Sequence, residues 1–359
     1  MERVYLRPTA FVDSPVGLDE AAQRLAGGLI WFSAVEIIRR SGATVTRELV
    51  PVSDIAARLP DLGDRATQAW QRLTAPRPAL TLRERTIRLD QPQVMGIVNV
   101  TPDSFSDAGQ LADATKAIEA GHAMAAAGAA IIDVGGESTR PGAQPVWEGD
   151  ESGRVIPVVR ALAGAGNAVS VDTRKAVVMA VALEAGAAMI NDVSALTFDN
   201  RSAEVLRGAS CPVVLMHHQG SPETMQQNPT YDGPALLEVY DWLEARVESA
   251  VAAGIDRARI IVDPGIGFGK NVQHNLELMN GLALFHGLGC PLLLGASRKR
   301  TIGALSNEAP PDQRLGGSLT LALKAAEQGA QIIRVHDVFE TVQALRVWRG
   351  LRDAALTAL

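Results

Sequence analysis

The sequence has 359 residues, 47% of them hydrophobic, which is enough for a large buried core. A net charge of −6 and an aromatic content of only 4% argue against broad binding to nucleic acid or to an anionic membrane surface. The two cysteines, Cys211 and Cys290, each precede a proline and an apolar run, so we expect both at the start of buried strands. Because the N-terminus carries no apolar leader and the cysteine count suits a reducing compartment, we expect a cytoplasmic protein.

The first 90 residues differ from the rest of the chain, because they contain 13 arginines and no lysine and lack a regular alternation of elements. Their apolar content is too high for a disordered tail. We expect residues 1–87 to form a small folded α/β domain, in which a helix near residues 21–40 buries Ile30, Phe32 and Ile37. Residues 74–91 are predicted to link this domain to the next. The segment shows no acid–base pair, so its predicted role is structural or regulatory.

From residue 92 onward, short apolar runs alternate with stretches of helical spacing. The runs cover residues 94–100, 130–134, 168–171, 188–191, 212–216, 259–262, 291–294 and 331–335, and clear helical stretches cover 112–127, 175–185, 235–253 and 314–328. Largely apolar strands that alternate with helices predict a parallel sheet covered on both faces. Eight such units predict that residues 88–359 form a (β/α)8 TIM barrel. The alternative is an open doubly wound sheet, but the first strand lacks the glycine fingerprint that usually follows in that fold.

Polar side chains follow each predicted strand, where the active sites of such barrels lie. Any one aspartate could simply cap the next helix, but polar residues follow all eight strands. Three of them, Asp172, Asn191 and Asp263, supply hydrogen-bond acceptors. Others, chiefly Lys299, Arg334 and His336, supply cations or donors. This combination predicts a site for a flat polar heterocycle with an anionic tail.

The glycine-rich segment 265–269 lacks the Gly-Lys-Ser/Thr start of a P-loop. We expect it to form a tight loop whose missing side chains let a flat ligand approach. The sequence also contains no Cys/His cluster that would predict structural zinc. A magnesium ion held mainly by substrate phosphates and a few protein oxygens fits better.

Two long segments carry a family resemblance. Residues 95–107, MGIVNVTPDSFSD, and residues 132–142, IDVGGESTRPG, resemble the two signatures of dihydropteroate synthases. Shorter blocks at the later strand ends match in the same order, so that the resemblance covers about residues 92–350. It implies a transferase of folate biosynthesis that condenses 7,8-dihydropterin-6-ylmethyl diphosphate with p-aminobenzoate and releases diphosphate. It further implies a magnesium cofactor, sulfonamide sensitivity of the family site, small-molecule substrates and a homodimer.

The resemblance also implies roles for individual residues. Asn99 corresponds to the magnesium ligand, and the residues expected to act in catalysis are Arg140, Asp172, Asp263 and Lys299. The pterin diphosphate would be held by Thr139, Asp172, Asn191, Asp263, Lys299, Arg334 and His336. The p-aminobenzoate would be received by Phe105, Thr139, Arg140, Pro141, Phe268 and Ser297. The reaction needs no enzyme nucleophile, which agrees with the absence of a nucleophile–base pair in these motifs.

His218 departs from the family pattern, in which methionine is common at a position that packs near the pterin. A histidine can still stack there, so we expect altered affinity and retained activity. Segments 101–111 and 138–147 are rich in Gly, Pro, Ser and Asp, and we expect them to move when substrate binds.

Two other functions compete with this interpretation. One is a methyltetrahydrofolate–corrinoid methyltransferase on the same barrel, which would not need the Thr-Arg-Pro loop or the Ser-Arg-Lys block, both present here. The other is a barrel that binds pterins without catalysis, for which loss of Arg140, Asp172 or Lys299 would be expected.

Overall fold

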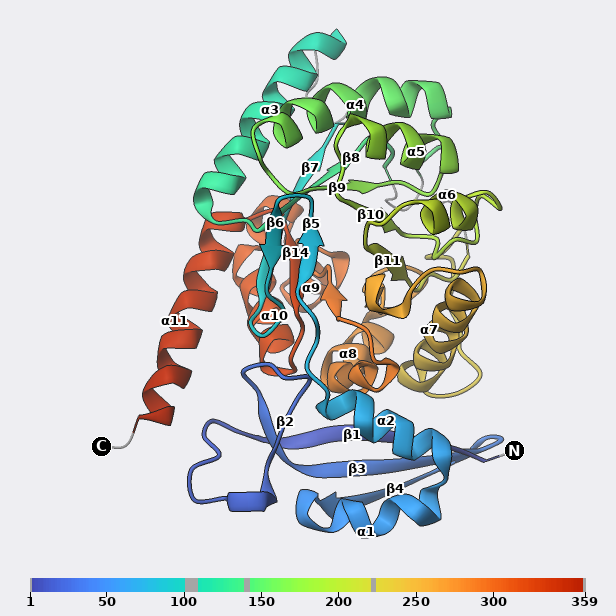
Figure 1. Cartoon of the computed structure of the whole chain (residues 1–359), viewed down its shortest axis with the longest axis vertical. Coiled ribbons are helices and arrows are strands. Elements are labelled where there is room, and N and C mark those ends of the chain that lie inside the picture. The colour runs from blue at the N-terminus through green and yellow to red at the C-terminus, as the bar shows by residue number, and fades with distance from the viewer. Residues whose placement is uncertain (1, 101–108, 139–142, 221–223, 358–359) are drawn as a thin grey trace.

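The structure, a computed structural model, describes residues 2–100, 109–138, 143–220 and 224–357 (Figure 1). Four residues with predicted roles, Phe105, Thr139, Arg140 and Pro141, lie outside these ranges. Most of the two segments predicted to move, 101–111 and 138–147, lies outside them as well. Within the described ranges, no helix combines the length and the apolar character needed to cross a membrane.

An eight-stranded parallel sheet forms the centre of the chain. Its strands are β7 (Gln93–Asn99), β8 (Ile131–Gly135), β9 (Val169–Asp172), β10 (Met189–Asp192), β11 (Val213–Met216), β12 (Ile260–Asp263), β13 (Leu293–Leu294) and β14 (Ile332–Val335). Their order is β12-β11-β10-β9-β8-β7-β14-β13. The two edges meet at a parallel bridge between Val262 and Leu292, so the sheet curls into a barrel. The predicted eight-stranded parallel sheet is confirmed, and each strand lies within two residues of its predicted run.

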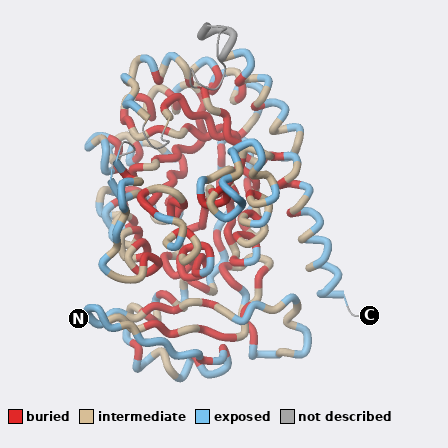
Figure 2. The backbone as a smooth tube through the Cα atoms, turned by 180° about the vertical axis from the view of Figure 1, so that it is seen from behind, coloured by how far each residue is buried: buried red, intermediate tan, exposed pale blue. Residues whose placement is uncertain are grey.

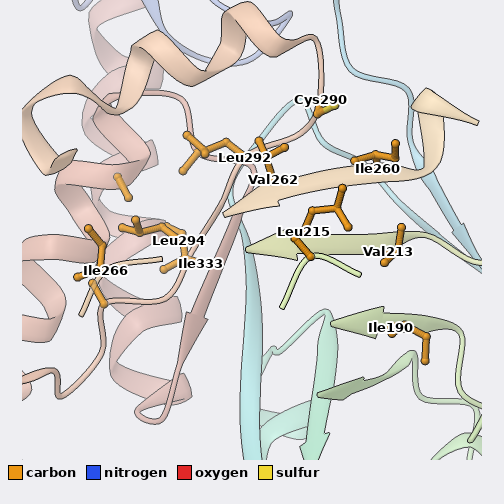
Figure 3. Close-up of a cluster of buried hydrophobic side chains, with 14 of the residues drawn as sticks. Ile190, Val213, Leu215, Ile260, Val262, Ile266, Cys290, Leu292, Leu294 and Ile333 are labelled. Atoms are coloured by element: carbon orange, nitrogen blue, oxygen red, sulfur yellow. The ribbon is translucent and has the colours of Figure 1, made fainter. Parts of the chain in front are cut away.

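Helices follow the strands and cover the outside of the barrel. They are α3 (Gly109–Ala127), α4 (Glu148–Gly164), α5 (Ala176–Ala185), α6 (Ser202–Gly208), α7 (Ala235–Ala252), α8 (Val272–Gly281), α9 (Arg300–Leu305), α10 (Leu315–Glu327) and α11 (Val338–Leu356). Apolar side chains pack between the strands and these helices, as Figure 3 shows for Val213, Leu215 and Val262. Figure 2 shows the buried backbone concentrated in this layer. The helix α5 ends before Gly186, whose φ of +121° is one that side chains rarely allow.

The interior of the barrel has its own cluster of buried residues, and part of it comes from outside the eight strands. A hairpin of β5 (Leu80–Leu82) and β6 (Arg85–Ile87) places Leu80, Leu82 and Ile87 in the same cluster as Met95 and Ile261. The prediction that residues 74–91 form only a linker is therefore wrong. The alternation of apolar and polar residues in Leu80-Thr81-Leu82 was the signal available in the sequence for this short strand.

The N-terminal segment forms an antiparallel sheet with two helices. The strands are β1 (Arg3–Val12), β2 (Gln23–Arg24), β3 (Trp31–Ser41) and β4 (Thr44–Pro51), followed by α1 (Val52–Leu62) and α2 (Asp64–Thr74). Central strand β3 pairs with the other three. The helix predicted near residues 21–40 is therefore wrong, although Ile30, Phe32 and Ile37 are buried as expected. Both faces of β3 are covered, and a run without polar alternation cannot distinguish a strand from a buried helix.

Candidate active site

A cavity of about 790 Å³ opens where the barrel strands end. Seven residues predicted from the sequence line it, namely Asn99, Asp172, Phe268, Ser297, Lys299, Arg334 and His336. Two further predicted residues, Asn191 and Asp263, are almost fully buried at the ends of β10 and β12. The described part of the predicted site therefore lies at one end of the barrel.

A buried ion-pair cluster joins three of these strands. The Arg334 guanidinium donates from Nε to Asp133 Oδ2 over 2.6 Å and from Nη2 to Asp172 Oδ2 over 2.8 Å. The same Asp133 oxygen accepts from Asn191 Nδ2 over 3.0 Å. Because this bond holds the amide nitrogen of Asn191, its amide oxygen remains as the acceptor available to a ligand.

The sequence places Asp133 among the polar residues at the strand ends, but no role in the site was predicted for it. It lies two residues before the end of β8, so its side chain points into the barrel one layer below the strand ends. Its carboxylate is fully buried, and its Oδ1 has no hydrogen-bond partner among the described residues. A buried aspartate within an otherwise apolar run was the signal that could have identified it.

The electrostatics of this cluster favour protonation of one member. Burial raises the pKa of Asp172 to about 7, the Arg334 cation opposes that rise, and the neighbouring Asp133 charge adds to it. The pKa of Arg334 is itself raised, because the carboxylates Asp133 and Asp172 outweigh its burial. Asp172 thus becomes a full hydrogen-bond acceptor only near and above neutral pH.

Asp263 stands on the opposite side of the barrel mouth. Its Oδ1 accepts a hydrogen bond from the backbone nitrogen of Gly265 over 2.7 Å. Its Oδ2 lies beside Gly295, which lines the cavity, at 3.9 Å from the point where a Cβ on that glycine would stand. Burial raises the pKa of Asp263 to about 6, against the hydrogen bond from Gly265 and the nearby cations Lys299 and Arg334.

The glycines of the loop 265–269 are required mainly for packing against a neighbouring segment, and less for admitting a flat ligand. Gly265 and Gly269 have φ of +68° and +65°, and an added Cβ would lie 1.9 Å from His217 O and 2.5 Å from Gln219 O. These two glycines therefore allow the loop to pack against the segment that follows β11, residues 217–219. Of the loop glycines, only Gly267, with φ of +83°, lines the cavity. A Cβ added to it would lie 3.3 Å from Cδ of the flexible Lys299 side chain. The expectation that the glycines admit a flat ligand fails for Gly265 and Gly269.

A buried lysine, Lys270, stabilises this loop through hydrogen bonds. Lys270 Nζ lies 2.8 Å from His217 Nδ1, 2.9 Å from Gly265 O and 3.0 Å from Phe268 O. Burial lowers the pKa of Lys270 well below its ordinary value, and burial likewise lowers that of His217. The three contacts fix the backbone on both sides of Phe268. This lysine, too, was missed by sequence reasoning, which treated it only as the end of the glycine segment.

The cationic side of the cavity combines three predicted residues with Phe268. Lys299 Nζ stands 4.1 Å above the centre of the Phe268 ring, within cation–π range. His336 Nδ1 lies 3.1 Å from Ser297 Oγ, which also accepts from the backbone nitrogen of His336 over 3.2 Å. Burial and then the Arg334 cation lower the pKa of His336 to about 3, so the ring is neutral at pH 7 and acts through hydrogen bonds.

A second ion-pair network supports the rim. Glu137 pairs with Arg174 over 2.9 Å and with Lys175 over 2.9 Å, and Lys175 also pairs with Glu151 over 2.5 Å. Burial alone would raise the pKa of Glu137, but the hydrogen bonds from Arg174, Val146 and Lys175 lower it overall. These charges anchor the chain after β8, at the point where the segment containing Thr139–Pro141 begins.

His218 contacts its own loop and the helix α7. Its Nδ1 lies 3.2 Å from Gly220 O, and its ring meets Trp242 edge-on at 5.8 Å. It is absent from the cavity lining. That His218 alters the affinity for a pterin stays a prediction.

The residues that could hold a metal ion are few. Within the described ranges, no group of three or more His, Cys, Asp or Glu side chains is arranged for metal binding. Asn99 contributes one amide oxygen to the cavity, on the strand next to β8. One neutral oxygen suits a hard cation that keeps several waters and takes its other ligands from phosphate, as Mg²⁺ does.

Comparison with known proteins agrees with this site. Residues 95–336 match the family described as pterin binding enzyme, so the chain belongs to that family. It is 48% identical over 263 residues to the dihydropteroate synthase of Escherichia coli (strain K12), covering 73% of this chain and 92% of the relative. The predicted family resemblance is confirmed.

Solved structures give the same result. The dihydropteroate synthase of Yersinia pestis in a sulfonamide drug complex superimposes with a TM-score of 0.73 at 47% identity, covering 77% of this chain and 99% of the other. The dihydropteroate synthase of Xanthomonas albilineans in complex with 7,8-dihydropteroate has a TM-score of 0.70 at 43% identity, with coverage of 77% and 99%.

Proposed function

We propose that this chain is a dihydropteroate synthase, which joins 7,8-dihydropterin-6-ylmethyl diphosphate to p-aminobenzoate and releases diphosphate. The observation that carries the proposal is the convergence of acceptors Asp172, Asn191 and Asp263 with the cation Lys299 at one barrel mouth. The relatives at 48% and 47% identity with this activity in their names support it.

The acceptors suit a pterin ring. A pterin presents an amino group beside a ring N–H, and a carboxylate can accept two parallel hydrogen bonds from that edge. We assign this contact to Asp263, whose Oδ2 lies beside the cavity-lining Gly295. Asn191 would accept through the amide oxygen that its bond to Asp133 leaves available. Asp172 would accept the remaining ring donor.

The cations suit the leaving group. Lys299, Arg334 and the neutral donor His336 would bind the diphosphate, which departs as the methylene carbon becomes cationic. The buried carboxylates Asp172 and Asp263 would stabilise that developing positive charge in a site of low dielectric constant. The p-aminobenzoate amine then attacks the carbon and loses a proton, so no enzyme nucleophile is required.

The p-aminobenzoate would lie against Phe268 and Ser297, next to Lys299. We assign Phe105, Thr139, Arg140 and Pro141 to the same subsite on the resemblance of their motifs alone. Because a sulfonamide imitates p-aminobenzoate in size and charge, we propose this subsite as the target of sulfonamides in this protein.

We further propose Mg²⁺ as the cofactor, with Asn99 as its protein ligand and the substrate diphosphate supplying the other anionic oxygens. When bound, the ion would neutralise charge on the leaving diphosphate. The finer organisation that we propose is a TIM barrel, residues 88–359, whose interior also takes the hairpin of residues 80–87, preceded by a small α/β domain formed by the residues before that hairpin. We propose a homodimer on the family resemblance alone. We propose a cytoplasmic location because the two cysteines, Cys211 and Cys290, are free and buried, which suits a reducing compartment.

One experiment separates this function from its alternatives. The purified protein is incubated with pterin diphosphate, p-aminobenzoate and Mg²⁺, and release of diphosphate and formation of dihydropteroate are measured. A synthase gives both products in equal amounts and neither without p-aminobenzoate. A pterin-binding protein without catalysis gives neither. Methyl transfer from methyltetrahydrofolate to a corrinoid, with no dihydropteroate, would contradict the proposal.

A further inference from the structure

The loop from β11 to α7, residues 217–234, connects the candidate active site with the outside of the barrel. In its described part, Met225, Gln226 and Pro229 line the cavity. The loop ends at Pro234, immediately before the first turn of α7. Its position therefore affects one wall of the site directly.

This loop also holds the glycine-rich loop in place. The Tyr231 hydroxyl donates to Gly269 O over 3.1 Å, and Gln226 Nε2 donates to Gly267 O. Burial raises the pKa of Tyr231, and the carboxylates Glu238 and Glu277 raise it further, so the hydroxyl stays protonated and remains a donor. Because Gly267 and Gly269 flank Phe268, a shift of the β11–α7 loop would carry Phe268 with it.

The far end of the same loop is held by the N-terminal sheet. Arg40, near the end of β3, donates from Nη2 to Glu238 Oε1 in the first turn of α7 over 3.1 Å. Its guanidinium also lies against Gly233, where an added Cβ would be 2.9 Å from Arg40 Nη2. Only 21% of the Arg40 side chain and 24% of Glu238 are exposed, so the pair is packed into the junction.

Further contacts keep the sheet against α7. The Tyr5 hydroxyl donates to Asp241 over 2.8 Å, and its ring meets Tyr240 edge-on at 5.6 Å. Arg65 pairs with Glu244 over 2.7 Å and stacks over Tyr5 at 5.0 Å. In Figure 1 the sheet lies along the side of the barrel where α7 and α8 run. The junction is thus broad, and Arg40 is its contact closest to the loop.

We propose that the N-terminal sheet braces the β11–α7 loop through Arg40, and that Arg40 is a positioning residue for the p-aminobenzoate subsite. The contacts run from Arg40 to Gly233 and Glu238, through Tyr231 to the glycine-rich loop that carries Phe268. This inference rests on the proposed function, and it assigns to the N-terminal segment a role in substrate binding without contact with substrate.

The test compares full-length Arg40→Ala with Arg47→Ala. Arg47 lies on the same sheet and pairs with Glu36 over 3.4 Å, with half of its side chain exposed. We expect Arg40→Ala to raise the KM for p-aminobenzoate about three- to tenfold, with kcat changed less than twofold. Chymotrypsin should also cleave it faster after Tyr231. We expect Arg47→Ala to match the unsubstituted protein in both measurements, so equal KM and cleavage rate in the two variants would overturn the proposal.

A double-mutant cycle provides an independent test. Tyr231→Phe removes the hydroxyl that bonds Gly269, so its effect on KM should overlap with that of Arg40→Ala. The combined variant should therefore raise KM by less than the product of the two single effects. If the combined variant instead raises KM by the full product of the two single effects, Arg40 and Tyr231 act independently and the proposal is contradicted.

If Arg40→Ala does not fold, Glu238→Gln replaces it in the cycle. If the unsubstituted protein forms no dihydropteroate, the proposed function fails, whereas loss of coupling in an active protein refutes only the brace.

Discussion

Replacing Asp133 with asparagine would test the electrostatic structure of the site. The substitution keeps one acceptor oxygen but removes the charge that Arg334 and Asn191 share on Asp133 Oδ2. A hydrogen bond to a charged group is worth about 1.5–3 kcal/mol, and breaking a buried ion pair costs about 3–5 kcal/mol. Because Arg334 keeps its bond to Asp172, we expect the free energy of unfolding to fall by about 2–3 kcal/mol, near the lower end of these values.

The same substitution should change the pH dependence of activity. The charge of Asp133 helps to raise the pKa of Asp172, so its removal must lower that pKa from about 7. A pterin N–H needs the ionised carboxylate, and kcat/KM of the unsubstituted protein should therefore decline as pH falls through the range set by Asp172 and by Asp263, whose pKa is about 6. In Asp133→Asn this acidic decline should move to lower pH.

Two measurements check this prediction, namely thermal unfolding and kcat/KM between about pH 5 and pH 9. Ser170→Ala is the matched control, since Ser170 pairs in register with Asp133, is fully buried, and its hydroxyl has no hydrogen-bond partner in the described part of the chain. It should alter neither the stability nor the pH profile appreciably. If the acidic decline in Asp133→Asn stays in place or moves upward, the account of the Asp172 pKa is incorrect.

Three further predictions concern other parts of the chain. Asp263→Asn should lower kcat about a hundredfold, since half of its acceptor capacity becomes a donor, and near-normal turnover would instead indicate a helix cap. Gly265→Ala should destabilise the fold by about 3 kcal/mol or more, because its methyl group would stand 1.9 Å from a backbone oxygen. Gly267→Ala shares the strained φ but meets only a flexible side chain, so equal melting temperatures would refute the clash. A fragment of residues 76–359 should retain diphosphate release, which the release assay measures. Its melting temperature, followed by circular dichroism, should exceed that of a fragment of residues 88–359, which lacks the hairpin.

Sequence reasoning was most successful for the barrel, for a physical reason. Strands covered on both sides consist almost wholly of apolar residues, so the polar residues at their ends stand out, as Asp172 at the end of β9 and Asp263 at the end of β12 illustrate. The same reasoning failed for residues 31–41, because a strand with two covered faces has no polar alternation and resembles a buried helix.

Within the site, sequence reasoning assigned roles to residues at the strand ends but none to two buried residues that support them. Asp133 lies one layer inside the barrel, and Lys270 is turned away from the solvent toward His217. The contacts of these two residues cannot be inferred from a strand end, because their partners are distant in sequence. Lys270 and His217 are 53 residues apart, and Arg334 and Asp133 are 201 apart.

The closure of the barrel between β12 and β13 has a consequence for local unfolding. Strand β13 has only two residues, and one bridge joins its chain to β12, where Val262 N donates to Pro291 O over 2.9 Å. The amide of Leu292 donates to the side chain of Gln331 over 2.7 Å. The barrel should therefore open first at this seam, so amide hydrogens along it should exchange with deuterium sooner than those of β8 and β9. Asp263 follows the seam directly, and each opening would carry this carboxylate away from the rest of the barrel mouth.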